Sequence, residues 1–469
     1  MLFGDHFWLA VLIPILVAPI PVGASLLFRQ RRAPALEVAC LALAGVAIAF
    51  VFGGALFAVT GLGFVLYTHW AALNIAATPS RARVRLMTAL IVLIGLAAAA
   101  ARMVIADSPL AIGRTLVPFG VSFYAFHGIS YLVNVHRRRV VPESDRLRLA
   151  LYLILLPPVV AGPVVYDAAT PQLARRLPSV SDYSFGVRRL VIGVWKVFVM
   201  AGLTAAEADA VFALRPDRLS GLEAWVGLTS FTLQMYYAFS GYADMAVGIA
   251  RMFGVRLPEN FRWPMVADSV RGFWQRWHIG LSAWFRECVD VSAEGRRSAL
   301  PPIAAEAVVA MFCGIWYGIG PTFVLWGAWH ALLIGAEGAG LEAILRRLPP
   351  ILRHVYLVLA VMLGWLLLRS ATLGDARIFA RALIGANGSV VSTRLTFGYD
   401  VWLTLAAGAI GSAPLSPMVR RWTVAIDALI ISALMASFAS LLFTWRGVRM
   451  VVNPVIRFWR GSPDAAGRP

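Results

Sequence analysis

The sequence predicts an all-α polytopic membrane protein. Three observations point to it: 60 % of the 469 residues are hydrophobic, only 14 % are charged, and the mean hydropathy is +0.75. Soluble domains are about half apolar and about one-quarter charged. This chain has too much apolar surface for a soluble fold, and disorder requires low hydrophobicity. Because a spanning helix needs about 20 apolar residues, the chain has room for roughly 10 to 12 membrane helices.

Thirteen apolar runs follow one another along the chain and are the candidates for these helices. The first run, about residues 7–28, is followed by Arg29, Arg31 and Arg32, so we expect a retained first helix whose C-terminal end is cytoplasmic. The other runs lie at about 36–58, 60–77, 86–106, 115–135, 147–166, 187–206, 221–250, 302–318, 321–341, 352–370, 397–412 and 423–445. We expect one integral-membrane domain over residues 1–469, and the sequence shows no inverted repeat typical of transporters.

The net charge of +18 comes from short arginine clusters between the apolar runs. This pattern is typical of loops that face an anionic inner leaflet, and it disfavours nucleic-acid binding. The clusters, each a candidate cytoplasmic loop, lie at residues 81–85, 137–139, 346–347 and 420–421. The positions of these clusters do not fit a regular alternation of loops between the two sides of the membrane. We therefore expect some segments, such as Leu155–Gly162, to be re-entrant.

Residues 251–301 interrupt this pattern, because they are too polar to span a membrane and rich in tryptophan. We expect an interfacial, amphipathic segment within the domain. The spacing predicts one helix over Ser269–Arg286, with Phe273, Trp277, Leu281 and Trp284 on a single face. A simpler interpretation is a helix that only anchors the protein at the membrane surface.

Two histidines are candidates for chemistry. His330 lies in an apolar run, where a titratable ring is costly unless it faces a cavity or a partner. An imidazole there is suited to act as a general base, although a histidine hydrogen-bonded between helices is the simpler alternative. His278 lies in the polar segment beside Arg276, Trp277 and Ser282, which could bind an anionic or acyl-carrying ligand. Its alternative is an exposed interfacial histidine.

Other motifs narrow the chemistry. Asp244 is the sole acid of the apolar segment 236–250 and is either a substrate-binding group or a structural hydrogen-bond node. His127 has no polar neighbour and is expected to be structural. The three cysteines, Cys40, Cys288 and Cys313, form no metal-binding pattern, so we expect no metal site and no bound cofactor. Phosphate loops and the GxSxG elbow are absent from the sequence.

Several segments together resemble a known family. They are VPFGVSFYAFHGISYLVNVHR (117–137), LLPPVVAGPVVYDAATPQL (155–173), YYAFSGYADMAVGIARMFGVRLPENFRWPMVADSVRGFWQRWHIGLSAWFRE (236–287), GIWYGIGPTFVLWGAWHALLIG (314–335), LGWLLLRSATLGDA (363–376) and NPVIRFWR (453–460). In this order they resemble the signature blocks of the membrane-bound O-acyltransferase family. The closest resemblance is to the bacterial branch that acetylates alginate and other exocellular polysaccharides. The resemblance implies membrane helices, with re-entrant and interfacial helices, around a central tunnel.

The resemblance also implies a reaction. Family members move an acyl group from a thioester to a hydroxyl, which implies acetyl-CoA or another acyl thioester as cytoplasmic donor. The acceptor would be a hydroxyl of an exported polysaccharide or of an extracytoplasmic partner. An extracytoplasmic acyltransferase or a polysaccharide-synthesis protein would be the partner, at the bacterial cytoplasmic membrane. His330 falls on the catalytic position, and His278 falls on the second signature position, which is more often Asn in eukaryotic members. Trp326, in the block of His330, is expected to line the substrate site.

Two departures and two alternatives accompany this resemblance. Tyr317, which we expect to line the substrate site, stands where relatives usually carry a histidine. Residues 288–297 diverge from their tyrosine-containing, Gly-rich loop. This divergence leaves donor and acceptor open. The alternative reaction is transfer of D-alanyl or another acyl group to a cell-envelope polymer or lipid. The alternative class is a non-catalytic transporter or flippase.

Overall fold

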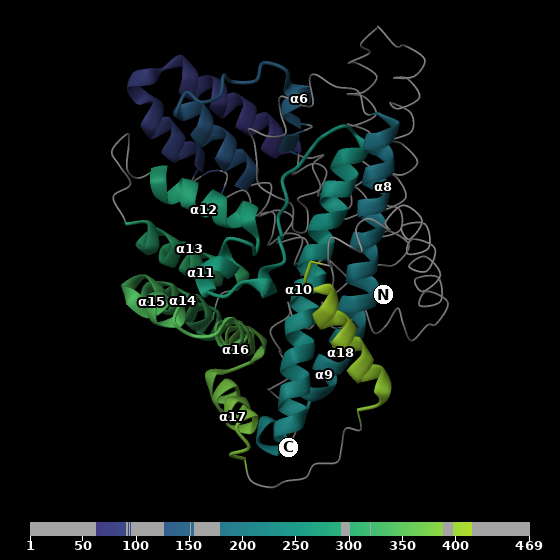
Figure 1. Ribbon diagram of the computed structural model, residues 1–469. Helices are drawn as coiled ribbons and strands as arrows, with labels where there is room; N and C mark the ends of the chain where they lie inside the picture. The colour runs from purple at the N-terminus through teal and green to yellow at the C-terminus, as the bar shows by residue number, and fades with distance from the viewer. Residues whose placement is uncertain are drawn as a thin grey trace, which may run out of the picture. The chain divides into compact units, whose positions relative to one another are not determined.

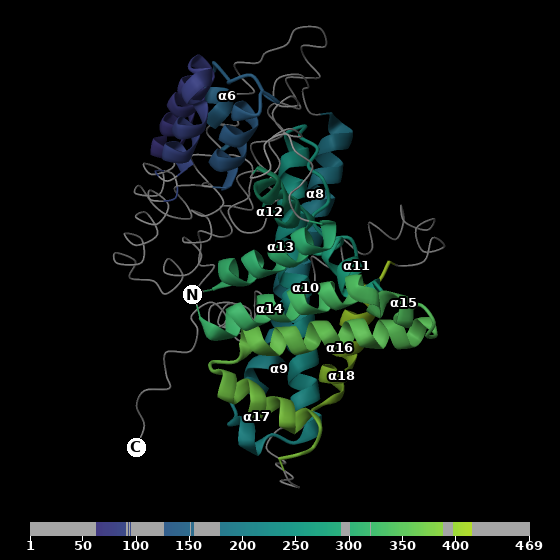
Figure 2. The ribbon, with the colours of Figure 1, turned by 90° about the vertical axis from the view of Figure 1, so that its left-hand side faces the viewer.

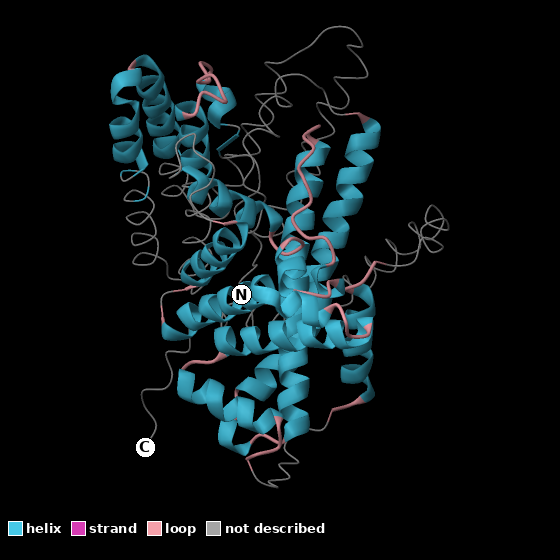
Figure 3. Cartoon of the chain, turned by 60° about the vertical axis from the view of Figure 1, so that its left-hand side comes forward, coloured by secondary structure: helices cyan, strands magenta, loops and turns pink. Residues whose placement is uncertain are grey.

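The computed structural model describes residues 62–90, 92, 94, 126–150, 152–153, 179–291, 301–318, 320–387 and 397–414. Within these residues the chain is built from helices and connecting loops, and no strand occurs there (Figure 3). The prediction of an all-α fold is therefore confirmed for the described residues. The runs predicted at 7–28, 36–58 and 423–445 lie outside them.

The described helices follow the order of the predicted runs, and the runs at 86–106, 115–135 and 147–166 lie only in part within the described residues. From the N-terminus the helices are Leu62–Ala77, η1 (Pro79–Arg81), 82–90, 126–136, α6 (Arg146–Ala150), α8 (Val180–Trp195), η3 (Lys196–Ala201), α9 (Gly202–Phe212) and η4 (Pro216–Arg218). They continue with α10 (Gly221–Met252), η5 (Pro264–Val266), α11 (Val270–Trp274), α12 (Ile279–Val291), α13 (Pro302–Tyr317) and α14 (Pro321–Ala336). The last are η6 (Glu337–Leu341), α15 (Glu342–Leu345), α16 (Pro350–Arg369), α17 (Leu373–Leu383) and α18 (Tyr399–Gly411) (Figure 1).

Two helical segments among the described residues are long and apolar enough to cross a membrane. They are Val180–Phe212, which joins α8, η3 and α9, and Pro350–Arg369, which is α16. Leu62–Ala77 and α13 are apolar but shorter. The total of roughly 10 to 12 spans stays a prediction, and so does the re-entrant segment Leu155–Gly162, which lies outside the described residues.

Local sequence signals explain where several helices begin. At α10 the backbone N–H of Ser220 donates to the Glu223 carboxylate at 2.9 Å, and the Glu223 N–H donates to the Ser220 hydroxyl at 3.3 Å. This reciprocal pair is a capping box, and Ser179 with Asp182 forms another at α8. Proline occupies the first position of α13, α14 and α16. At this position the missing N–H removes no hydrogen bond within the helix.

The chain separates into two compact units. The first holds residues 1–194 and 242–259, and the second holds residues 195–241 and 260–469, so α10 begins in the second and ends in the first. The single domain predicted over residues 1–469 stays a prediction.

In the first unit, α8 packs closely against the end of α10. A Cβ on Gly186 would lie 2.6 Å from the carbonyl oxygen of Gly248, so only glycine permits this approach. Arg251 of α10 and Asp182 of α8 form an ion pair at 2.7 Å across the same interface.

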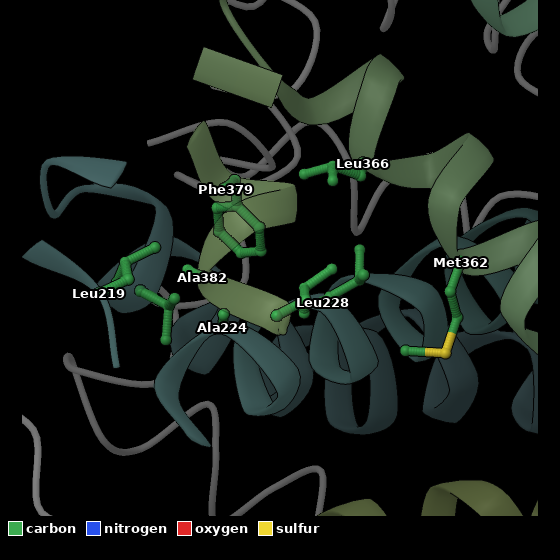
Figure 4. Close-up of a cluster of buried hydrophobic side chains, with 9 residues drawn as sticks. Leu219, Ala224, Leu228, Met362, Leu366, Phe379 and Ala382 are labelled. Atoms are coloured by element: carbon green, nitrogen blue, oxygen red, sulfur yellow. The ribbon is translucent and has the colours of Figure 1, made fainter. Parts of the chain in front are cut away.

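In the second unit, α13, α14 and α16 form a packed layer in which α14 lies between the other two (Figure 2). Below α16, a buried apolar cluster joins α16 and α17 to the start of α10 (Figure 4). Its members are Val211, Leu219, Ala224, Leu228, Met362, Leu366, Phe379, Ala382 and Leu383. This cluster packs against α16, which also contributes to the site described below.

Candidate active site

His330 lies on α14, inside the second unit, with 1 % of its surface exposed. Small residues bring α14 close to α13, since a Cβ on Gly314 would lie 2.6 Å from the carbonyl oxygen of Phe323. The ring of His330 contacts Trp326 one turn earlier on α14, at a centroid distance of 4.7 Å, and Trp274 of α11 at 5.6 Å. His330 is therefore a core residue of the helix layer.

The two ring nitrogens of His330 have different surroundings. The indole nitrogen Nε1 of Trp274 donates a hydrogen bond to Nδ1 at 3.4 Å. Nε2 has no hydrogen-bond partner among the described residues. It faces α16 at Gly364, where a Cβ would lie only 2.7 Å from it. A buried polar atom left in this way costs free energy unless a ligand or water satisfies it, so Nε2 is a candidate atom for contact with a ligand.

His278 lies at a break between two short helices, and this corrects the sequence analysis. The single helix predicted over Ser269–Arg286 is wrong: α11 ends at Trp274 and α12 begins at Ile279. His278 has a φ of 45°, in the left-handed region, which no residue adopts within a right-handed helix. The alternative of an exposed histidine is also wrong, because His278 is 1 % exposed.

Asn260 defines the orientation of the His278 ring. The backbone N–H of Gly280 donates to Oδ1 of Asn260 at 2.8 Å, so the amide nitrogen Nδ2 is the atom that faces Nδ1 of His278, at 3.5 Å. Since an amide nitrogen only donates, Nδ1 accepts and the neutral ring carries its proton on Nε2. Burial lowers the pKa of His278 to about 4, so the ring is neutral at physiological pH and presents an N–H donor.

A continuous set of aromatic contacts joins the two histidines, and we call it the aromatic cluster. Its members are Phe239, Phe261, Phe273, Trp274, Trp277, Trp316, Tyr317, Trp326 and Trp365. One path through it runs from His278 to Phe239 at 6.3 Å, then to Tyr317 at 5.9 Å. From Tyr317 it continues to Trp326 at 5.2 Å and so to His330. The site is therefore an apolar, aromatic environment with few polar atoms.

The structure brings several of the predicted site residues together in this cluster. Trp277, Trp326 and Tyr317 are buried members of it. The ring of Tyr317 packs edge-on against the ring of Trp326. Ser282, one turn into α12, is buried, its backbone N–H bonds the carbonyl of His278 at 3.0 Å, and its hydroxyl has no partner among the described residues.

Two predicted residues have other surroundings. The carbonyl of Arg276 accepts from the N–H of Arg262 at 3.0 Å, and the structure records no contact of its guanidinium with either histidine. Asp244 belongs to the first unit, where its carboxylate accepts from Nε of Arg189 at 2.9 Å. Arg189 also pairs with Glu259. This ion pair corresponds to the structural interpretation of Asp244.

Three residues that contact the histidines or their helix were missed from the sequence. Trp274 and Asn260 bind the histidine rings, and Gly364 faces Nε2 of His330. Trp274 precedes Trp277 by three residues, and Gly364 directly precedes Trp365, so both lay within the quoted motifs. The sequence does not show their contacts with the histidines, because α11, α14 and α16 are far apart in sequence and meet only in the folded chain.

Residues 139–360 match the model of the membrane-bound O-acyltransferase (MBOAT) family. This segment therefore resembles an MBOAT domain. It contains His278 and His330 as well as Asn260 and Trp274, while Gly364 follows it. The resemblance found in the sequence is thereby confirmed, including the expectation of an acyltransferase family.

Curated relatives agree with this family. The chain is 35 % identical over 276 residues to the probable alginate O-acetylase AlgI of Azotobacter vinelandii, covering 58 % of this chain and 55 % of the relative. It is 28 % identical over 305 residues to the peptidoglycan O-acetyltransferase of Helicobacter pylori, covering 58 % of each. It is 22 % identical over 235 residues to the teichoic acid D-alanyltransferase of Bacillus subtilis, covering 47 % of this chain and 59 % of the relative. The matches thus span little more than half the length of these relatives.

Proposed function

We propose that this chain is an O-acyltransferase of a bacterial cytoplasmic membrane that moves an acetyl group from a cytoplasmic thioester, such as acetyl-CoA, to a hydroxyl of an exported polysaccharide. The observation that carries the proposal is the pair of buried histidines, each with an Nε2 that has no hydrogen-bond partner among the described residues, within the segment that matches the MBOAT family model. The relatives named as O-acetylating enzymes favour acetyl as the acyl group. An extracytoplasmic acyltransferase or polysaccharide-synthesis partner would pass the acyl group onward or present the acceptor.

In this reaction His330 acts as general base. It takes the proton of the acceptor hydroxyl while the oxygen attacks the thioester carbonyl, a C–O bond forms, the C–S bond breaks, and the proton passes to the leaving thiolate. A well-placed base contributes about 10²–10⁴-fold. His278 donates from Nε2 to the carbonyl oxygen as negative charge develops there. The aromatic cluster limits water and so limits hydrolysis of the thioester.

The test is transfer of labelled acetyl from acetyl-CoA by the purified protein in detergent or liposomes. His330→Ala is expected to lower transfer by at least 100-fold while the protein remains folded. His354→Ala is the matched control, because His354 is another histidine of the second unit and its Nδ1 lies 3.2 Å from the carbonyl oxygen of Ala267 instead of within the aromatic cluster. Unchanged transfer in His330→Ala would refute the role of His330. Absence of label on any hydroxyl acceptor would favour a transporter or flippase.

A second candidate is D-alanyl transfer to a cell-envelope polymer, favoured by the match to a teichoic acid D-alanyltransferase. The same assay with a D-alanyl thioester on a small carrier protein distinguishes the two donors. Acetyl transfer without D-alanyl transfer would exclude this candidate.

A further inference from the structure

The hydrogen bond from Trp274 determines which nitrogen of His330 carries the proton. An indole nitrogen has a hydrogen to donate and no lone pair to accept with. Nδ1 of His330, 3.4 Å from it, must therefore present its own lone pair. The proton of the neutral ring then lies on Nε2, the nitrogen that faces Gly364.

The position of Trp274 is itself fixed by a buried acid that the proposed reaction does not use. The Glu337 carboxylate, 2 % exposed, accepts from the backbone N–H of Val270 at 2.7 Å and of Arg271 at 3.0 Å. Tyr356 donates its hydroxyl to the same carboxylate at 3.1 Å. Because Glu337 directly follows α14, it ties the start of α11 to the helix that carries His330. Glu337 thus connects the helix that carries Trp274 to the helix that carries His330, and this keeps the indole against the imidazole ring.

Charged groups on the surrounding helices do not compete for the ring. On α11, Arg271 pairs with Glu306 of α13 at 2.8 Å and with Glu342 at 3.5 Å. On α16, His354 bonds a backbone carbonyl, Arg353 pairs with Asp268, Arg369 pairs with Asp209, and Tyr356 bonds Glu337. Among the described residues, the ring contacts of His330 are with Phe273, Trp274, Trp326 and Gly364, none of which is charged.

The consequence is that the nitrogen open to substrate is a donor in this state and has no lone pair for a proton. A carbonyl oxygen can accept from Nε2–H, but a water or hydroxyl near Nε2 cannot be deprotonated there. Base catalysis at Nε2 requires the proton to move to Nδ1, which requires the indole to leave Nδ1.

We propose that Trp274 is a positioning residue that holds His330 in a resting tautomer with the proton on Nε2. In this tautomer Nε2 cannot accept a proton until the indole releases Nδ1. This deepens the proposed function and rests on it for its catalytic consequence. Release transfers one proton from Nε2 to Nδ1 through a water or the acceptor hydroxyl, and the charge of the ring does not change. While Trp274 holds Nδ1, water beside a bound thioester has no base, so the thioester is protected from hydrolysis.

The direct test is ¹⁵N NMR of protein labelled at its histidines, with the signals of His330 assigned by their loss in His330→Gln. We expect a pyridine-type Nδ1 and a pyrrole-type Nε2 in the parent protein. Trp274→Phe, which removes the donor and keeps an aromatic ring, should shift this ratio toward the other tautomer. Trp329→Phe is the matched control, because Trp329 lies next to His330 on α14 and its indole donates to the carbonyl of Ala360 at 2.9 Å. It should leave the signals of His330 unchanged.

The second readout is the ratio of acetyl-CoA hydrolysis to acetyl transfer. We expect Trp274→Phe to raise this ratio at least threefold and Trp329→Phe to leave it unchanged. A parent protein with a pyrrole-type Nδ1 on His330, or an unshifted tautomer in Trp274→Phe, would overturn the proposal even if His330 proves to be the base. Unaltered hydrolysis in a variant with a shifted tautomer would overturn its catalytic part. The parent spectrum decides the assignment even if Trp274→Phe fails to fold.

Discussion

At the residue scale, His278 occupies a backbone conformation that its side chain does not favour. Its φ of 45° costs an ordinary L-residue about 1–2 kcal/mol, whereas Asn adopts the left-handed region more readily. The position therefore suits a residue that tolerates this conformation and can donate a hydrogen bond. Histidine meets the second requirement through Nε2, and Asn would meet both through its amide.

We predict that His278→Asn retains more stability and more activity than His278→Ala. The unfolding free energy of His278→Asn should exceed that of His278→Ala by about 1 kcal/mol, because Ala, like His, adopts the left-handed region at a free-energy cost. His278→Asn should keep a measurable part of the transfer rate, while His278→Ala should lose at least tenfold. Thermal unfolding in detergent and labelled-acetyl transfer measure the two quantities. Equal transfer rates in all three proteins would show that His278 is purely structural.

The burial of His278 also predicts a pH dependence of stability. Its pKa is lowered to about 4 in the folded protein, against about 6.5 in the unfolded chain. Between these values the unfolded chain binds more protons, so unfolding becomes easier as the pH falls from 6.5 toward 4. The loss should reach about 3 kcal/mol. Unfolding temperatures from pH 7.5 to 4.5 should fall more steeply for the parent than for His278→Asn, and identical slopes would contradict the prediction.

The identity of the two histidines could be predicted from the sequence, but their hydrogen bonds could not. His330 is conspicuous in the sequence because its imidazole lies in an apolar run, and His278 because it lies in the polar segment. Asn260 and Trp274 are not, because polar and aromatic residues are common in the interfacial segment around them. Their roles depend on contacts with Nδ1 of His278 and of His330, which only the folded chain brings together.

At the scale of elements, the error over Ser269–Arg286 shows the limit of periodicity. The four residues expected on one helical face, Phe273, Trp277, Leu281 and Trp284, are all buried. Burial of a periodic face does not require an unbroken helix, since two short helices can bury the same residues. The break is stabilised by Asn260, whose backbone and side-chain oxygens accept from the N–H groups of Ile279 and Gly280 at the start of α12.

The contact between α13 and α14 predicts a steric effect at one glycine. A Cβ on Gly314 would lie 2.6 Å from the carbonyl oxygen of Phe323 and 3.0 Å from the Cα of Gly327. Because both are backbone atoms, the helices must separate. Gly314→Ala should lower the unfolding free energy by about 1–3 kcal/mol.

Gly335→Ala on α14 is the matched control, since no atom lies within 4 Å of its Cβ position. It should leave stability unchanged or raise it by up to about 1 kcal/mol through helix propensity. Chemical denaturation in detergent measures both variants. A Gly314→Ala protein as stable as Gly335→Ala would show that the helices do not approach this closely in the folded protein.

At the scale of the whole molecule, composition predicted the class of protein and could not predict the number of spans. The hydrophobic content is distributed over helices of unequal length, and α13 has 16 residues while α16 has 20. Near 1.5 Å per residue, the shorter helix falls below the thickness of a bilayer core. Hydropathy alone does not separate such a buried core helix from a spanning one.

The arginine clusters predict which segments face the cytoplasm, because positive charge is retained on that side of the membrane. Arg83, Arg139 and Arg347 each belong to a different cluster and are all exposed. In a variant that lacks Cys40, Cys288 and Cys313, single cysteines at these three positions should react with a membrane-impermeant maleimide in inverted vesicles and not in intact spheroplasts. Tyr399→Cys is the reference for a position outside any cluster, since Tyr399 is 90 % exposed. A cluster labelled only from the outside would place its loop on the extracytoplasmic face, and the positive-inside pattern would then not apply to that pair of helices.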